Sequence, residues 1–132
     1  MRRFTTFVVL LLVLVSGGAL LLGADKAPKP DPNLKLPDYR NWSHVKSMVI
    51  FDEKHPLFAS FGGLHHVYAN DKAFPSTGSQ TTYPDGSVLV FVLFEAAEKD
   101  GTYNAGAKKV TAVMEKAGKY KETGGWGFQA WG

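Results

Sequence analysis

The chain has 132 residues, of which 45 % are hydrophobic and 20 % are charged, with a formal net charge of +3 and no cysteine. This length allows one domain at most. Without cysteine, these residues hold no disulfide, thiol nucleophile, zinc–thiolate site or iron–sulfur cluster, so the domain must rest on its hydrophobic core.

The first 24 residues have the pattern of an export signal. Residues 1–3 are basic ("MRR"), residues 7–15 form an uncharged apolar run, and small residues at 23–24 suit cleavage. Residues 1–24 are therefore expected to be a signal peptide, and the domain is expected to be exported to the periplasm. The alternative is an uncleaved anchor, because the apolar stretch approaches the lower limit of about 17 residues for a spanning helix. Contact with a membrane is expected only through such an anchor.

Residues 25–37 are expected to be a proline-rich linker. Four prolines in this segment favour an extended, polyproline-like spacer. Removing Arg2 and Arg3 with the leader leaves 13 basic and 12 acidic residues, which are interspersed. No basic stripe appears, so a nucleic-acid partner is not expected. The domain is then residues 38–132, and Asp38 is expected to cap a short helical turn before the first strand.

Short runs of branched and aromatic residues separated by turn signals predict a mainly β domain. The run 87–94 is apolar on both faces, which is typical of a central strand, and the sequence "YPDG" leads into it. We expect an antiparallel sheet or sandwich of about five strands with a short N-terminal helical turn, and loops over 74–82, 98–106 and 116–125. The expected strands are 44–51, 64–70, 87–96, 108–114 and 125–131.

Histidines are the candidates for a metal site. His65 and His66 are neighbours on an expected strand, so their side chains point to opposite faces and are not expected to bind one metal ion. His44 and His55 lie on or near the first strand and can approach one of them. A site of two or three histidines is left open, although no ligand spacing supports it. The alternative is one packed and one solvated histidine.

Other side chains that carry chemistry indicate no catalytic group. The carboxylates fall in turns or near strand ends, and no serine has evident histidine and aspartate partners. Among the C-terminal aromatics, Trp126 and Phe128 share one strand face and Trp131 lies on the other. They are expected to pack in the core, with the lining of a ligand pocket as the alternative.

Four ordered segments resemble the cytochrome P-460 / cytochrome c′-beta family. They are "DYRNW" at 38–42, "HHVYANDKAF" at 65–74, "YPDGSVLVFVLFE" at 83–95 and "GGWGFQAW" at 124–131. The resemblance implies a small exported β-sheet protein that binds c-type haem and small nitrogen ligands such as nitric oxide or hydroxylamine. Many members are dimers, so the resemblance also allows a homodimer.

The sequence departs from the family's pattern at three places. The family attaches haem through a Cys-x-x-Cys-His motif beyond the Gly-x-Trp-x-Phe strand, and this sequence has no such motif before it ends at Gly132. The resemblance places Phe91 where hydroxylamine-oxidising members have a lysine that cross-links to haem, and Thr111 where they have a distal glutamate. A phenylalanine at 91 is similar to the cytochrome c′-beta branch, whose apolar distal side favours small gases.

These departures imply that hydroxylamine oxidation is not expected, and that the chain in this form is not an enzyme. The favoured interpretation is a haem-less relative, or one that binds haem or a small apolar ligand non-covalently. The alternatives are a truncated c-type cytochrome and a histidine-metal binding protein. The apolar face formed by Phe91, Leu89 and Leu93 suits either a core or the distal side of a haem.

Overall fold

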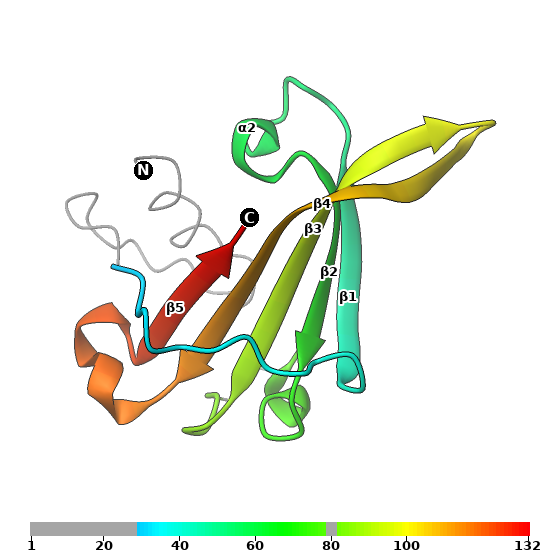
Figure 1. The fold of residues 1–132 in the computed structure, drawn as a ribbon. Helices are drawn as coiled ribbons and strands as arrows, with labels where there is room; N and C mark the ends of the chain where they lie inside the picture. The colour runs from blue at the N-terminus through cyan, green and yellow to red at the C-terminus, as the bar shows by residue number, and fades with distance from the viewer. Residues whose placement is uncertain (1–28, 79–81) are drawn as a thin grey trace.

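The described residues, 29–78 and 82–132 of the computed structural model, form a single five-stranded antiparallel sheet. The strand order is β1-β2-β3-β4-β5, so each strand pairs with its neighbour in sequence (Figure 1). The predicted fold class is confirmed, as one sheet rather than a sandwich. The predicted leader 1–24, the linker residues 25–28 and the loop residues 79–81 lie outside the described residues. The strands are β1 Ser43–Ile50, β2 Gly63–Ala69, β3 Val88–Lys99, β4 Thr102–Lys116 and β5 Trp126–Trp131.

The prediction of a loop over 98–106 is wrong. Strands β3 and β4 continue through this segment and are joined by Asp100 and Gly101 alone, which have φ values of 52° and 75°. Two successive positive φ values give a tight hairpin turn whose twist matches that of the strands, and Asp-Gly is a favoured sequence for it. Irregular pairing around Phe94 bends this hairpin, and Figure 1 shows its tip leaning away from the other strands.

Three short helices occupy the connections in the described parts of the chain. The one-turn helix α2 (Phe58–Phe61) lies between β1 and β2, the 3-10 helix η1 (Phe74–Ser76) follows β2, and the 3-10 helix η2 (Gly118–Thr123) precedes β5. The sequence interpretation did not foresee α2. It lies at one end of the sheet, whereas η1 and η2 lie at the other (Figure 1). Before β1, Trp42 N donates to Tyr39 O at 2.9 Å in a single turn. Within the described residues, no helix has the length and apolar character that would cross a membrane.

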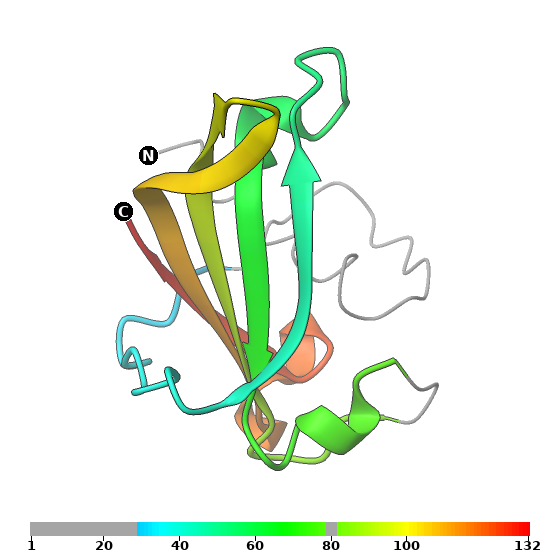
Figure 2. The same ribbon diagram turned by 90° about the vertical axis from the view of Figure 1, so that its right-hand side faces the viewer.

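Strand β3 is central, as predicted, and its alternating side chains divide the core into two faces. Figure 2 shows the strands side by side with β1 and β5 at the edges. Phe91 lies in the larger buried cluster, here called the Phe91 face, which also packs against α2. Val92 lies in a smaller cluster, here called the Val92 face, which Tyr39 and Trp42 cover. The buried members are Ile50, Phe61, Val67, Ala69, Ala73, Leu89, Phe91, Leu93, Ala112, Met114, Trp126 and Phe128 on the Phe91 face, and Val90, Val92 and Val113 on the Val92 face.

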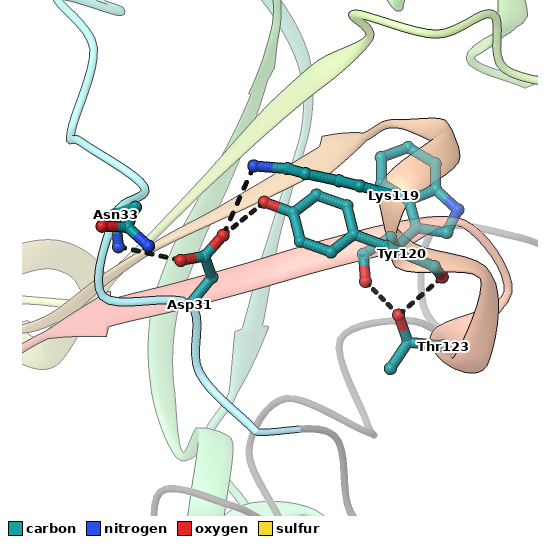
Figure 3. A network of polar contacts seen from close by, with 6 residues as sticks. Asp31, Asn33, Lys119, Tyr120 and Thr123 are labelled. Atoms are coloured by element: carbon teal, nitrogen blue, oxygen red, sulfur yellow. Dashed lines mark hydrogen bonds and ion pairs between the residues drawn. The ribbon is translucent and has the colours of Figure 1, made fainter.

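The second half of the proline-rich linker is bound to the domain. Asp31 N donates to Phe128 O at 2.7 Å, and the Tyr120 hydroxyl donates to Asp31 Oδ2 at 2.7 Å (Figure 3). Lys119 Nζ lies 3.5 Å from the same carboxylate oxygen, and these bonds lower the pKa of Asp31. The Tyr120 ring lies directly over Gly127, where a Cβ atom would come within 2.1 Å of it. A glycine in β5 therefore makes room for the tyrosine that holds the linker.

Candidate functional site

The Phe91 face contains the position that the resemblance assigned to a haem pocket. Phe91 is 2 % exposed, and its register partners are Val67 on β2 and Ala112 on β4. The ring of Phe61 from α2 meets the Phe91 ring edge-on, with centroids 5.8 Å apart. The His65 ring also packs against Phe91, with its centroid 5.1 Å from that of Phe91. Two strands and a helix thus place an imidazole against an apolar, aromatic surface.

His65 is the unusual group on this face. It is 1 % exposed, and neither ring nitrogen has a hydrogen-bond partner among the residues that the structure describes. Burial lowers its pKa to about 4, and the nearby charge of Lys46 acts in the same direction. At neutral pH the ring is therefore uncharged and has an unused lone pair. A buried polar group without a partner costs about 1–3 kcal/mol, and such groups are enriched at functional sites.

Thr111, the other family position, lies on the opposite face from Phe91. It pairs with Val92 on β3 and with Trp131 on β5, whereas Phe91 pairs with Ala112. Thr111 is also buried, and its hydroxyl has no partner among the described residues. Because the sheet separates them, Phe91 and Thr111 do not line one pocket. A haem-binding role for either residue stays a prediction.

The predicted orientation of the adjacent histidines is confirmed. His66 lies on the Val92 face, where its ring is 5.9 Å from that of Phe94, whereas His65 packs against Phe91. Burial, and then the charge of His44, lower the pKa of His66. His65 and His66 therefore cannot hold one metal ion.

His44 approaches His66, as the sequence allowed. Their ring centroids are 5.8 Å apart, and the Ser47 hydroxyl lies between the two rings. His55 lies apart from them, in the turn after β1, where its Nδ1 accepts a hydrogen bond from Leu57 N at 3.2 Å. No group of three or more histidine, aspartate or glutamate residues in the described ranges is placed to hold a metal ion. The structure thus brings together His44 and His66, whereas His55 and His65 lie apart from them.

The C-terminal aromatics are core residues, with the predicted division between faces. Trp126 and Phe128 are buried on the Phe91 face, and Trp131 packs against the Val92 face. Lys116 Nζ lies 5.5 Å from the Trp126 ring centroid, which adds a cation–π contact at the edge of the core.

A cavity of about 340 Å³ lies between α2 and the β3–β4 hairpin, next to the Phe91 face. The rings of Phe51 and Tyr103 stack at its rim with centroids 5.8 Å apart, and Lys109 Nζ donates to Gly62 O at 2.7 Å. Sequence reasoning missed these residues, because it treated Tyr103 as part of a loop. The signal was present: the Asp-Gly pair predicts the hairpin that brings Tyr103 opposite Glu98. The cavity is lined by Ile50, Phe51, Phe58, Gly62, Gly63, Glu95, Ala96, Glu98, Tyr103 and Lys109.

Of the comparisons with known proteins, the family comparison gives a match. A search of curated protein sequences returned no significant match. The family model for cytochrome P460 matches residues 36–132, from the end of the linker through β5. The match includes both faces of the sheet and most of the chain. The chain therefore belongs to the cytochrome P460 family.

Proposed function

We propose that this chain is an exported ligand-binding protein of the cytochrome P460 family, and that the Phe91 face around His65 binds haem or a small apolar ligand without a covalent link. One observation carries the proposal: His65 is a buried, uncharged imidazole without a hydrogen-bond partner among the described residues, and it packs directly against Phe91. Export is supported by the leader pattern of residues 1–24.

The residues on this face fit haem in one respect and limit its attachment in another. A neutral imidazole can coordinate haem iron, and His65 would hold the iron through a nitrogen lone pair. The sequence has no cysteine, so these residues form no thioether bond to the ring. Phenylalanine at 91 has no nucleophilic atom, so it forms no cross-link. Haem held by these residues alone would be extractable.

The surroundings of His65 favour binding over catalysis. His65 is 1 % exposed and packs against Phe91, so little water reaches the imidazole. The buried polar side chains in the described part of the chain include no carboxylate that could relay a proton. Haem, when bound, supplies an iron atom that coordinates small nitrogen ligands such as nitric oxide. Because His65 is buried, a ligand reaches it only when side chains of the Phe91 face move. A small apolar ligand requires less displacement than haem does.

The test is a haemin titration of the purified full chain, followed by the Soret band. We expect one haem per chain, a band that organic extraction removes, and a shifted band when nitric oxide is added to the reduced form. His65→Leu is expected to weaken binding at least tenfold. The matched control is His66→Leu, which removes the adjacent imidazole from the other face and is expected to bind as the wild type does.

Equal haemin affinity in the wild type and in His65→Leu would contradict the role of His65. If no Soret band forms, benzene is the next probe, observed through the NMR signals of Phe91 and His65. If neither haemin nor benzene binds at these residues, the proposed function of this face is overturned.

A further inference from the structure

Two imidazoles on the Val92 face converge on one point. His44 Nε2 lies 2.8 Å from the Ser47 hydroxyl oxygen, and His66 Nδ1 lies 2.6 Å from the same oxygen. Ser47 on β1 and His66 on β2 are register partners, and His44 is opposite Tyr68, two pairs further along the sheet, with a register shift between His44 and Lys46. The convergence is built by strand pairing, which makes it a property of the fold.

We propose that His44 and His66 bind a divalent transition-metal ion, which takes the place of the Ser47 hydroxyl between the two rings and completes its coordination with water. This inference is independent of the proposed function, because the site lies on the opposite face from Phe91 and His65.

The geometry requires only side-chain movement. The two distances to Ser47 Oγ place the imidazole nitrogens no more than 5.4 Å apart. Two nitrogens bound to a tetrahedral ion at about 2.0–2.1 Å are roughly 3.4 Å apart. The side chains of His44 and Ser47 are exposed, so rotation about their χ angles can close this gap while the backbone stays in register.

The tautomers are compatible with a metal ion. A hydroxyl has one proton, so in the bridge it donates to one imidazole and accepts from the N–H of the other. Metal binding needs a lone pair on both facing nitrogens, so one ring moves its proton to its far nitrogen. Both rings remain neutral, so the bound ion contributes the only added charge.

The ligand set selects the class of ion. Imidazole favours copper and zinc, whereas calcium and magnesium require several oxygen ligands. The described histidine, aspartate and glutamate side chains form no three-ligand group, so the ion would keep an exchangeable water. Aromatic rings surround the pair: Tyr68 lies 5.6 Å from the His44 ring, and Phe94 lies 5.9 Å from the His66 ring. These rings restrict the imidazoles and reduce the entropy lost on binding.

The experiment uses the full chain without a polyhistidine tag, freed of metal by chelation and titrated with Zn²⁺ in a calorimeter. We expect one Zn²⁺ per chain, with affinity at least tenfold weaker in His44→Ala and in His66→Ala. The matched control is His55→Ala, which removes a histidine from the turn after β1 and is expected to change nothing. Circular dichroism checks that each variant is folded.

Two further measurements make the test specific. Ser47→Ala removes the hydroxyl that occupies the position and keeps both imidazoles, so it is expected to bind Zn²⁺ at least as tightly as the wild type. In NMR spectra of the imidazole nitrogens, His44 Nε2 and His66 Nδ1 are expected to shift on binding, whereas the His65 signals stay in place. Loss of binding in Ser47→Ala, or undiminished binding in His44→Ala and His66→Ala, would overturn the proposal. So would the absence of Zn²⁺ binding by the wild type.

Discussion

The two faces of the sheet place neighbouring, identical side chains in different environments. His65 packs among aromatic and aliphatic groups on the Phe91 face, with no hydrogen-bond partner among the described residues. His66, one residue later, is partly exposed on the Val92 face, and its Nδ1 lies 2.6 Å from the Ser47 hydroxyl. The strand period of two separates them completely. The environment of a histidine therefore depends on the face of the sheet on which its side chain lies, and not on residue type alone.

The largest expected effect comes from breaking the Phe91 face at its centre. Phe91→Ala removes a fully buried ring that contacts Phe61 and His65, so the free energy of unfolding should fall by about 3–5 kcal/mol. Urea denaturation measures this loss. The matched control is Phe51→Ala, since Phe51 is 64 % exposed, and its cost should stay within about 0.5 kcal/mol. Equal costs for the two variants would mean that the Phe91 face is not a closely packed core.

The second prediction tests the buried, neutral state of His65. Its pKa is about 4 in the folded chain against 6.5 in the reference state, so below pH 6.5 the unfolded chain binds a proton that the folded chain does not. The contribution of His65 to the free energy of unfolding is thus fully present above pH 6.5 and is lost as the pH falls from 6.5 towards 4. Below pH 4 this group causes no further loss. The full difference is on the order of 3 kcal/mol.

His65→Leu isolates this contribution from those of the other ionisable groups. The urea-denaturation stability of His65→Leu should fall less between pH 7 and pH 4.5 than that of the wild type. His66→Leu should keep a pH dependence close to that of the wild type, because His66 is less buried. If wild type and His65→Leu lose the same stability, the imidazole is accessible to protons in the folded state.

The third prediction concerns the edge of the Val92 face at β5. Gly127→Ala places a methyl group where the Tyr120 ring lies, so the ring must move and the bond from its hydroxyl to Asp31 is strained or lost. The free energy of unfolding should fall by about 1–3 kcal/mol. Gly118→Ala is the control, since the nearest atom to its Cβ would be 3.5 Å away. In a Tyr120→Ala background, the loss of free energy of unfolding caused by Gly127→Ala should largely disappear. An unchanged loss would show that the added methyl group clashes with a group other than the Tyr120 ring.

The sequence was sufficient to predict the sheet, because runs of branched and aromatic residues and the turn signals between them are local features. The doubly apolar run around Phe91 marked β3 as central. The extension of the β3–β4 hairpin was missed, since its solvated strands carry polar and small residues on both faces. There the turn at Asp100-Gly101 sets the structure, and turn chemistry was given too little weight.

The candidate sites were predictable only in part. Opposite orientations for His65 and His66 follow from strand geometry. The convergence of His44 and His66 on Ser47 depends on the register between β1 and β2 and on the irregularity after His44, which a single sequence does not encode visibly. The placement of Thr111 on the far side from Phe91 likewise depends on the register of β3 with β4. Register depends on long-range packing, so it cannot be predicted from the local sequence of each strand.

The smallest expected effect is electrostatic and lies within the histidine pair of the Val92 face. Burial and the neighbouring charge of His44 both lower the pKa of His66, so His44→Ala should raise that pKa by removing the second cause. Burial is the larger cause and stays, so the pKa should remain below the ordinary value for histidine. An NMR titration of the His66 ring protons measures it, with His55→Ala as the control that should leave it unchanged. A pKa of His66 that falls in His44→Ala would mean that His44 stabilises the charged form of its neighbour, and the two rings would then act as a proton-sharing pair.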